Sequence, residues 1–274
     1  MTRGDGDRVV LCGLGHEHWG HYGAAGLLPV ADGYVLLQQR GAGTSGSGTW
    51  GMFGGARDSH EDTVTAALRE AGEESTLDPE LVDPFGVVVE DHGGWTYETV
   101  IAWADERFAV EPVSAETAGA AWVPVDAVTD LELFAPFAAN WTRLRECLEP
   151  PVLVVDCANV MGSRPDGWWR DRAGAAARLR DRLAAADGFP GLPPFDVAYP
   201  EIVLVVEGQA RRTAAVPGVE VVSAQHNGDD KIVEVARENP GCVVVTADRE
   251  LRARCVAVGA QYIGPGWLQD LLPD

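Results

Sequence analysis

The stretch Gly55–Leu77 reads GARDSHEDTVTAALREAGEESTL, and the first half of the chain is organised around it. From Asp62 onward, apolar residues recur at i, i+3, i+4 and i+7, which predicts an amphipathic helix. These apolar residues are Val64, Ala67, Leu68 and Ala71. A second face of the same helix carries Glu70, Glu73 and Glu74, because residues three and four apart are neighbours on a helix surface.

Three carboxylates on one helix face repel one another unless a positive charge lies between them. Mg²⁺ is a hard cation that takes oxygen ligands, keeps several of its waters and shares substrate phosphates. The alternative is a solvated acidic face without a ligand. The fixed spacing of the glutamates from Gly55, Glu61 and Arg69 favours a site for Mg²⁺ or Mn²⁺.

This stretch resembles the signature of the Nudix hydrolases: a glycine, five residues, a glutamate, seven residues, then Arg-Glu-apolar-x-Glu-Glu-x-Gly-apolar. The resemblance covers about residues 20–148 and implies an α/β/α sandwich with a mixed sheet. It also implies metal-dependent hydrolysis of a nucleoside diphosphate linkage, with a nucleotide as the substrate. The implied metal-site residues are Gly55, Glu70, Glu73 and Glu74, and Arg69 is expected to position these acids through ion pairs.

In this family a further acid often joins the metal site or acts as the base. Predicted strands at Phe85–Glu90 and Thr96–Ala104 offer Glu90 and Glu98 for that role. The alternative is that each is an outward residue of an alternating strand. Other predicted strands of this half are Val9–Leu14, Gly23–Pro29, Gly33–Arg40 and Ala120–Pro124, and a helix is predicted at Phe137–Leu148.

Two positions depart from the family pattern. Phe53 stands where proline is usual, in the turn Trp50–Gly55. Thr76 replaces the late glycine, and a β-branched residue in a strained backbone conformation costs roughly 1–3 kcal/mol. We therefore predict that Thr76 has an ordinary negative φ and that the helix ends differently here.

A length of 274 residues exceeds the common single-domain size of roughly 100–150 residues, which predicts two domains. Consecutive prolines after Glu149 place the boundary there, giving domains 1–149 and 150–274. No run of 18 apolar residues occurs, so no membrane span is expected. The N-terminus lacks the apolar region of a signal peptide, and the five cysteines are scattered. We therefore expect a cytoplasmic protein with reduced thiols.

The net charge of −21 is unevenly divided, with −17 in residues 1–150 and −4 in residues 151–274. The first half therefore repels polyanions and is expected to meet phosphates only through a metal. In the same half, His16, His18 and His21 suggest a metal site. Their spacing matches no known zinc arrangement, and no partner Cys or Glu pattern accompanies them, so we expect none.

The second half alternates strands and helices, which predicts a parallel α/β sheet. The predicted strands are Val152–Asp156, Ile202–Val206, Val219–Ser223, Cys242–Thr246 and Gln261–Ile263. Ligands gather at the carboxyl ends of such strands, and acids stand there in this sequence. They are Asp156, Glu207 and Asp248 after three strands, and Asp229 with Asp230 at the start of a helix. Several acids at one rim indicate a nuclease in which paired cations stabilise the oxygens of a phosphodiester.

Residues 151–272 resemble the PIN-like nucleases of the NYN group, which have a Rossmann-like parallel sheet. The resemblance rests on the motifs VVDCANVMG, VVEG, GDDKIV and VVTADREL. It implies metal binding by Asp156, Glu207, Asp229, Asp230 and Asp248, and catalytic roles for Asp156, Asn159, Asp229 and Asp248. Cys157-Ala158 departs from the Gly-Tyr that is common in this group. The alternatives are a degenerate site that only binds, or a dinucleotide site, which the missing GxGxxG disfavours.

Six arginines between Arg164 and Arg182 surround Trp168 and Trp169. Exposed aromatic rings stack unpaired bases while arginines follow the phosphates, so single-stranded RNA is the predicted partner of this domain. The alternative is that the tryptophans pack into the core or against the first domain, with the arginines offsetting its charge.

Two hypotheses cover the whole chain. Either both domains are hydrolases, or one is catalytically silent and senses nucleotide or RNA to control the other. The particular substrate and the oligomeric state are left open, a homodimer being one option.

Overall fold

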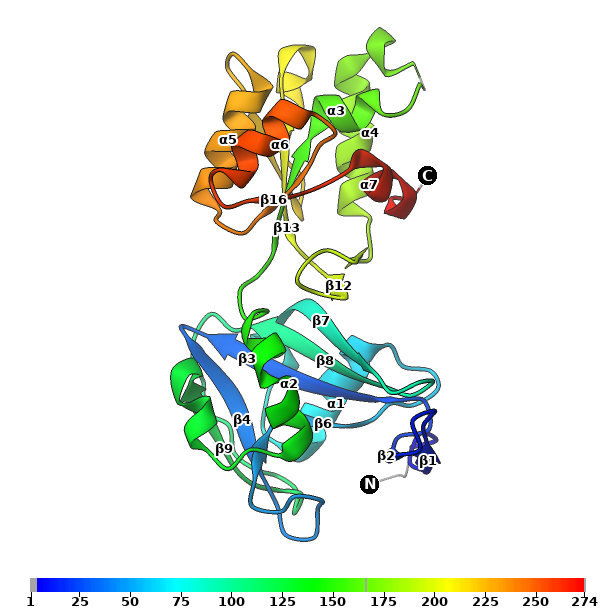
Figure 1. Cartoon of the computed structure of the whole chain (residues 1–274), viewed down its shortest axis with the longest axis vertical. Helices are drawn as coiled ribbons and strands as arrows, with labels where there is room; N and C mark the ends of the chain where they lie inside the picture. The colour runs from blue at the N-terminus through cyan, green and yellow to red at the C-terminus, as the bar shows by residue number, and fades with distance from the viewer. Residues whose placement is uncertain (1–3, 166, 274) are drawn as a thin grey trace. The chain divides into compact units, whose positions relative to one another are not determined.

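A computed structural model describes residues 4–165 and 167–273 (Figure 1). The chain divides into two compact units, which we call the N-terminal unit (Met1–Glu149 with Pro194–Val197) and the C-terminal unit (Pro150–Pro193 with Ala198–Asp274). The sequence did not predict that Pro194–Val197 belongs to the first unit. Phe195 packs edge-to-face on Phe85 at 5.9 Å, and the Asp196 amide donates to the Val87 carbonyl at 3.0 Å.

The N-terminal unit is built on a mixed β-sheet. Its strands are β3 (Ala24–Ala31), β4 (Tyr34–Arg40), β5 (Trp50–Gly51), β6 (Phe53–Ala56), β7 (Asp83–Asp91), β8 (Thr96–Trp103) and β9 (Thr117–Pro124). The strand order is β7-β8-β3-β4-β5, with β6 paired to β3 and β9 to β4. The β3–β8 pair is parallel and the other pairs are antiparallel, so the predicted mixed sheet is present.

Strands β3 and β4 are joined by a hairpin turn at Asp32-Gly33. Both residues have positive φ, 47° and 77°, as a two-residue turn matched to the twist of the strands requires. All eight residues of β3 are buried, because this strand lies inside the sheet with a helix layer on each face.

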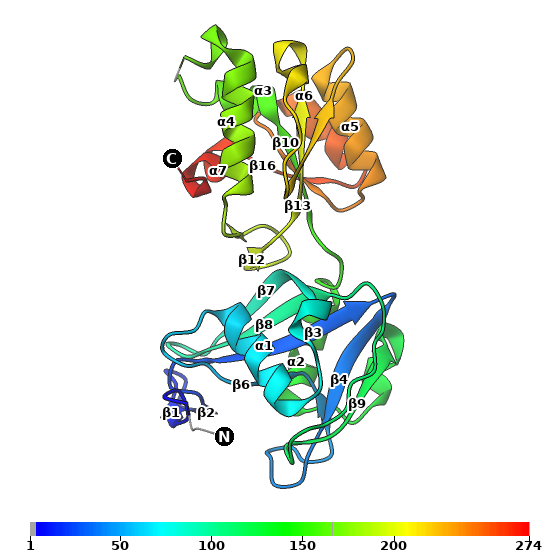
Figure 2. The same cartoon turned by 180° about the vertical axis from the view of Figure 1, so that it is seen from behind.

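Two helices cover opposite faces of this sheet, which makes the predicted α/β/α arrangement: α1 (Thr63–Glu74) and α2 (Ala135–Arg145) (Figures 1 and 2). Short 3₁₀ turns lie at η1 (Pro79–Leu81) and η2 (Val125–Asp130). A separate antiparallel hairpin, β1 (Val9–Leu11) with β2 (Glu17–Trp19), precedes the sheet.

Helix α1 begins where the sequence indicates and ends before Thr76. The Asp62 carboxylate caps it by accepting from the Thr65 amide at 2.7 Å. The helix ends at Glu74, and Ser75 is extended. Among the described residues only Asp32 has a positive φ without being glycine, so Thr76 does not, which confirms the predicted re-routing. Thr76 instead pairs with Glu111, its amide donating to the Glu111 carbonyl at 2.9 Å.

The C-terminal unit has a five-stranded sheet in which every pair is parallel, as predicted. Its strands, in spatial order, are β14 (Val219–Ser223), β13 (Glu201–Val206), β10 (Val152–Asp156), β15 (Val243–Val245) and β16 (Gln261–Ile263). The two-residue strands β11 (Phe189–Pro190) and β12 (Val197–Ala198) pair with each other and are not part of this parallel sheet. Strands β13, β10 and β15 are buried along most of their length because helices cover both faces of the sheet.

One face of the parallel sheet carries α5 (Gly228–Glu238) and α6 (Arg249–Val256) (Figure 2). The other carries α3 (Cys157–Gly162), α4 (Arg172–Ala184) and α7 (Pro265–Leu271), with 3₁₀ turns at η3 (Trp168–Arg170) and η4 (Gly208–Arg212). The sequence placed Asp229 and Asp230 at the start of a helix, and they lie in the first turn of α5. In the described part of the chain, no helix has the length and apolar character needed to cross a membrane.

Candidate functional site

The three glutamates of α1 line a cavity of about 1030 Å³ in the N-terminal unit. Glu70, Glu73 and Glu74 project from one face of the helix toward the β6 end, where Gly54 and Gly55 form another wall. The cavity wall also includes Trp19, Arg40, His60, Arg69 and Glu116. The spacing read from the sequence therefore does place the carboxylates together at one concave surface.

Arg69 holds two of the acids in place. Its guanidinium makes a two-point contact with Glu61, Nε to Oε1 at 2.6 Å and Nη2 to Oε2 at 3.0 Å. It also reaches Glu70 Oε1 at 2.7 Å and the Ala56 carbonyl at 2.9 Å. The hydrogen bonds from Arg69 lower the pKa of Glu61, and Glu61 in turn raises the pKa of Arg69. Planar two-point pairs of this kind fix orientation as well as charge.

Glu74 is the buried acid of the cluster, with 7% of its surface exposed. Its Oε2 accepts from the Gln38 side-chain amide at 2.8 Å and from the Gly54 backbone at 3.0 Å. Gln38 is itself held by Thr117, whose hydroxyl donates to Gln38 Oε1 at 2.5 Å. Burial raises the pKa of Glu74 to about 8, and the nearby Glu70 adds to the shift.

Glu70 packs directly against the backbone of Gly55. A Cβ at position 55 would lie 2.3 Å from Glu70 Oε2, so only glycine leaves this carboxylate where it is. Burial raises the pKa of Glu70, and the Arg69 pair partly offsets that shift. Two buried or half-buried carboxylates that favour protonation need a proton or a cation to stay together. The oxygen donors therefore fit a divalent metal ion.

Comparison with known proteins agrees with this geometry. A family model described as the NUDIX domain matches residues 20–144. A Mycobacterium tuberculosis protein named "Putative 8-oxo-dGTP diphosphatase 3" is 46% identical over 156 residues, which is 53% of this chain and 71% of that protein. The chain belongs to the Nudix family. Its N-terminal unit is a Nudix hydrolase domain.

Two further relatives carry the same domain. The crystal structure of a Nudix hydrolase from M. smegmatis, RenU, is 42% identical, covers 52% of this chain and 94% of that one, and superposes with a TM-score of 0.50. A "Nucleoside triphosphate pyrophosphatase/Nudix hydrolase fusion protein" from Bifidobacterium longum is 37% identical over 153 residues, 53% of this chain and 32% of that protein. Both matches agree with the fold described above.

Glu98 and Glu90, which the sequence offered for the further acid, are not among the residues that line the Nudix cavity. Glu98 accepts from Thr63 at the start of α1, from Thr96 at 2.9 Å and from Arg57 at 3.3 Å. Glu90 accepts from the side chain of Asn140 in α2 at 2.5 Å. Both carboxylates support the fold, because β8 and β7 turn these side chains toward neighbouring elements.

Glu116 is the acid that the sequence analysis missed. It directly precedes β9, lines the cavity and contributes to the raised pKa of Glu74. No local pattern marks it, since its position depends on the pairing of β9 with β4, where Arg40 faces Thr117.

The raised pKa of Glu74 gives a prediction for stability without divalent metal. In the folded state the pKa of Glu74 lies above its ordinary value of 4.5. The contribution of this side chain to folding stability is therefore fully present below pH 4.5 and is lost as the pH rises through about 8. We expect Glu74→Gln to match the unaltered protein near pH 5 in Mg²⁺- and Mn²⁺-free buffer. Near pH 9 the variant should be the more stable, by on the order of 4 kcal/mol.

Thermal unfolding of both proteins at the two pH values measures this difference, and added Mg²⁺ at pH 9 should reduce it. Equal melting temperatures at pH 9 would show that burial does not raise the pKa of Glu74 as expected.

The C-terminal unit has a cavity of its own, of about 480 Å³, at the carboxyl ends of β10 and β13. Its lining includes five of the predicted residues: Asp156, Asn159, Glu207, Asp229 and Asp248. Backbone amides hold three of these carboxylates. The Asn159 amide donates to Asp156 at 3.0 Å, that of Gly228 to Glu207 at 2.9 Å, and that of Leu251 to Asp248 at 2.8 Å.

Asp230, which the sequence also offered as a metal ligand, is not among the residues that line this cavity. Its carboxylate pairs with Arg254 at 2.5 Å and is exposed. Successive helix residues point about 100° apart, so α5 can turn only one of Asp229 and Asp230 toward the cavity. Burial raises the pKa of Asp156, with Asp229 and Glu207 adding to it, and burial with the charge of Asp248 raises that of Asp229. These oxygens fit a cation for the same reason as those of α1.

Some of the arginines near the two tryptophans are held by other parts of the C-terminal unit. Arg182 is bound by the C-terminal end of the chain, donating to the carbonyls of Pro273 and Leu272. Arg164 donates to the Gln269 carbonyl at 2.8 Å. Trp169 is 53% exposed, so it is not part of the core, and Arg172 lies 5.3 Å from the ring of Trp168. Arg164 and Arg182, two of the six arginines, are therefore committed to local contacts.

Proposed function

We propose that the Nudix unit cleaves the diphosphate linkage of a nucleoside triphosphate or related nucleotide with Mg²⁺ or Mn²⁺. The observation that carries this is the convergence of Glu70, Glu73 and Glu74 on one cavity, with Glu74 buried. Nudix hydrolases generally use divalent metal ions. The name of the M. tuberculosis relative makes 8-oxo-dGTP and dGTP the first nucleotides to test.

The roles of the chain's own residues follow from their contacts. Glu70, Glu73 and Glu74 would hold the cation, which supplies charge stabilisation and lowers the pKa of bound water. Arg69 is a positioning residue, since it fixes Glu61 and Glu70 rather than facing the cavity with a free guanidinium. Gln38 and Gly54 hold Glu74 Oε2 in one orientation. Trp19 and Arg40 on the wall suit an aromatic base and a phosphate.

We propose Glu116, in place of Glu98, as the acid that orients or deprotonates water. A general base contributes about 10²–10⁴-fold, so Glu116→Gln should lower kcat by about a hundredfold or more. Glu98→Gln, in β8, is the matched control, and we expect its kcat to stay within about threefold because Glu98 does not line the cavity. Initial rates at saturating Mg²⁺ and nucleotide measure both. A large loss of kcat in Glu98→Gln and a small one in Glu116→Gln would assign the role of base to Glu98 and exclude Glu116.

We propose further that the C-terminal unit is a metal-dependent ribonuclease that prefers single strands. The supporting observation is the set of four acids that line one cavity, three of them at or just after strand ends and one at the start of α5, with Asn159 beside them. Phosphodiester cleavage by paired cations needs such oxygen donors. The exposed Trp169 is suited to stack an unpaired base.

The second candidate is a chain in which one unit is catalytically silent and senses nucleotide or RNA. It is favoured by the commitment of several arginines to local contacts, which reduces the surface left for RNA. Metal-dependent release of phosphate, diphosphate or mononucleotide from a panel of nucleotides and single-stranded RNA separates the two. Turnover of both classes by the full chain supports two enzymes, and turnover of one class supports the sensor.

The protein is proposed to act in the cytoplasm. All five cysteines are free and buried, as expected of a reducing compartment.

A further inference from the structure

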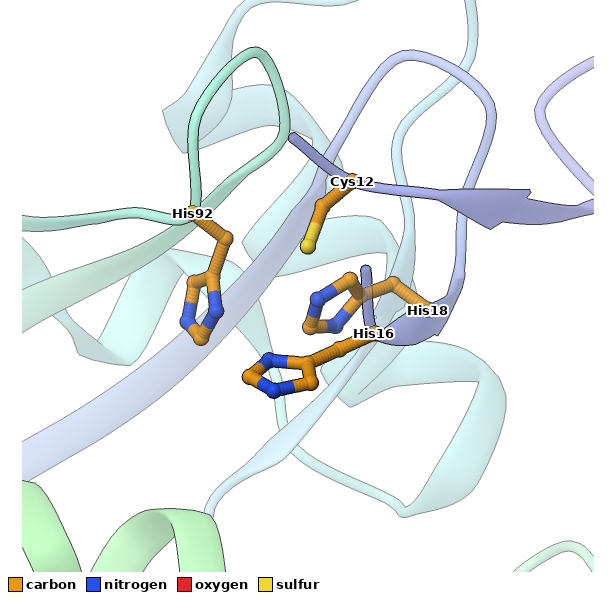
Figure 3. Close-up of side chains that lie close together, drawn as sticks. All are labelled: Cys12, His16, His18 and His92. Atoms are coloured by element: carbon orange, nitrogen blue, oxygen red, sulfur yellow. The ribbon is translucent and has the colours of Figure 1, made fainter. Parts of the chain in front are cut away.

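Four metal-ligating side chains converge at the N-terminal hairpin (Figure 3), and none of them lines the Nudix cavity. They are Cys12, His16, His18 and His92. Each presents one ligand atom, and all four atoms lie within 4.8 Å of one another. Three of the residues come from the β1–β2 hairpin, and His92 directly follows β7. Sequence spacing could not reveal the set, because His92 is distant in the chain.

Two of these histidines have buried ring nitrogens without a hydrogen-bond partner in the described structure, His18 Nε2 and His92 Nδ1. Buried polar atoms are nearly always paired, so an orphaned pair of atoms at one point needs an explanation. A metal ion between them would use both lone pairs. The two rings already lie side by side in an edge-to-face arrangement, with centroids 4.6 Å apart (Figure 3).

The surroundings hold these ligands in place. His18 stacks on Trp95, with ring centroids 3.9 Å apart and planes 11° from parallel. The Trp95 indole donates to the Gly20 carbonyl at 2.8 Å, and Cys12 packs with Trp95 and Ala24 in a small buried cluster. Gly13 approaches Gly93 so closely that a Cβ would lie 2.5 Å from the Gly93 carbonyl oxygen. The hairpin and the turn that carries His92 are therefore already in contact.

The hairpin is a segment that needs such a connection. Each of its strands has three residues, and Val9 and Leu11 are 60% and 69% exposed. An isolated two-stranded hairpin is marginally stable in water, and small elements commonly use a metal where a core is lacking. Trp19, adjacent to His18, lines the Nudix cavity, so fixing the hairpin also fixes this wall.

We propose that Cys12, His16, His18 and His92 bind one zinc ion that joins the β1–β2 hairpin to the turn after β7. One thiolate and three imidazoles are the donors that Zn²⁺ prefers, and four protein ligands make a closed, structural site. Zn²⁺ ligands at about 2.0–2.3 Å in tetrahedral geometry stand roughly 3.3–3.8 Å apart. Small side-chain rotations close the gap from the observed spacing. Mg²⁺ and Mn²⁺ favour oxygen donors, so the two metal sites are chemically separate.

The test uses the full chain, purified without a polyhistidine tag and reconstituted with Zn²⁺ under reducing conditions. We expect one equivalent of zinc by elemental analysis after excess Mg²⁺ has been added and removed. Cobalt in its place should give the absorption bands of tetrahedral Co²⁺ with a thiolate-to-cobalt band. Cys12→Ser should abolish the thiolate band, and His92→Ala should weaken metal affinity at least about tenfold.

His21→Ala and Cys147→Ser are the matched controls, a histidine of the same segment and a buried thiol elsewhere, and both should keep one equivalent. X-ray absorption on the unaltered zinc protein needs no variant, and we expect one sulfur and three nitrogen ligands. Substoichiometric zinc in the unaltered protein, an all-oxygen shell, or unchanged binding in Cys12→Ser and His92→Ala would each overturn the proposal.

Discussion

Glu74→Gln is expected to lower diphosphate hydrolysis about a thousandfold while the Nudix unit stays folded. Glutamine keeps the shape of the side chain and removes the charge that would face the cation. Loss of a metal ligand removes several kcal/mol of transition-state stabilisation, and about 4 kcal/mol corresponds to a factor of a thousand. The effect should fall on kcat, because the ligand acts on the charge that develops during the reaction.

The measurement is initial rate against nucleotide concentration at saturating Mg²⁺, with a melting curve for each protein. Glu80→Gln is the matched control, an exposed glutamate of η1 outside the cavity, and it should leave kcat unchanged. Near-normal turnover by Glu74→Gln would remove Glu74 from the metal site. A collapse of folding would not be expected, since Gln38 and Gly54 can still bond the amide oxygen.

The sequence predicted the parts of the Nudix site that lie on one helix. Helical spacing alone fixes the common face of Glu70, Glu73 and Glu74, and Arg69 makes the ion pairs expected of it. The sequence offered Glu98 on another strand for the further acid and gave no sign of Glu116, which lines the cavity. Whether a strand residue faces a cavity depends on register and on neighbouring elements, which no local pattern encodes.

The same division holds in the C-terminal unit. The order of strands and helices indicated a parallel sheet, and the rule that ligands gather at strand ends located the cavity. The rule did not distinguish Asp229 from Asp230, because the rotation of α5 is set by packing of Ile232 and Val233 on the sheet. The proximity of Cys12 to His92 was missed because the two residues are far apart in the sequence. Only folding brings the β1–β2 hairpin to the turn after β7.

Asp229 and Asp230 provide the sharpest test of the C-terminal cavity, because they are adjacent and chemically identical. Asp229 lines the cavity, and Asp230 pairs with Arg254 outside it. We expect Asp229→Asn in the full chain to lower metal-dependent cleavage of single-stranded RNA by at least about a hundredfold, through loss of several kcal/mol of charge stabilisation. Asp230→Asn loses only an exposed ion pair, commonly worth below about 1 kcal/mol, and should cleave at nearly the normal rate.

Both variants should keep the nucleotide activity of the Nudix unit, which verifies folding and excludes a general loss of protein. RNA cleavage is then measured in a second set of proteins, in which each variant also carries Glu74→Gln to silence the Nudix site. Cleavage of a labelled RNA is followed with Mn²⁺ or Mg²⁺ and with neither. If the unaltered chain cleaves no RNA with either metal, the ribonuclease assignment fails and the sensor alternative takes its place. If Asp229→Asn and Asp230→Asn cleave equally well, the cavity is not the site, because only one of the two carboxylates reaches it.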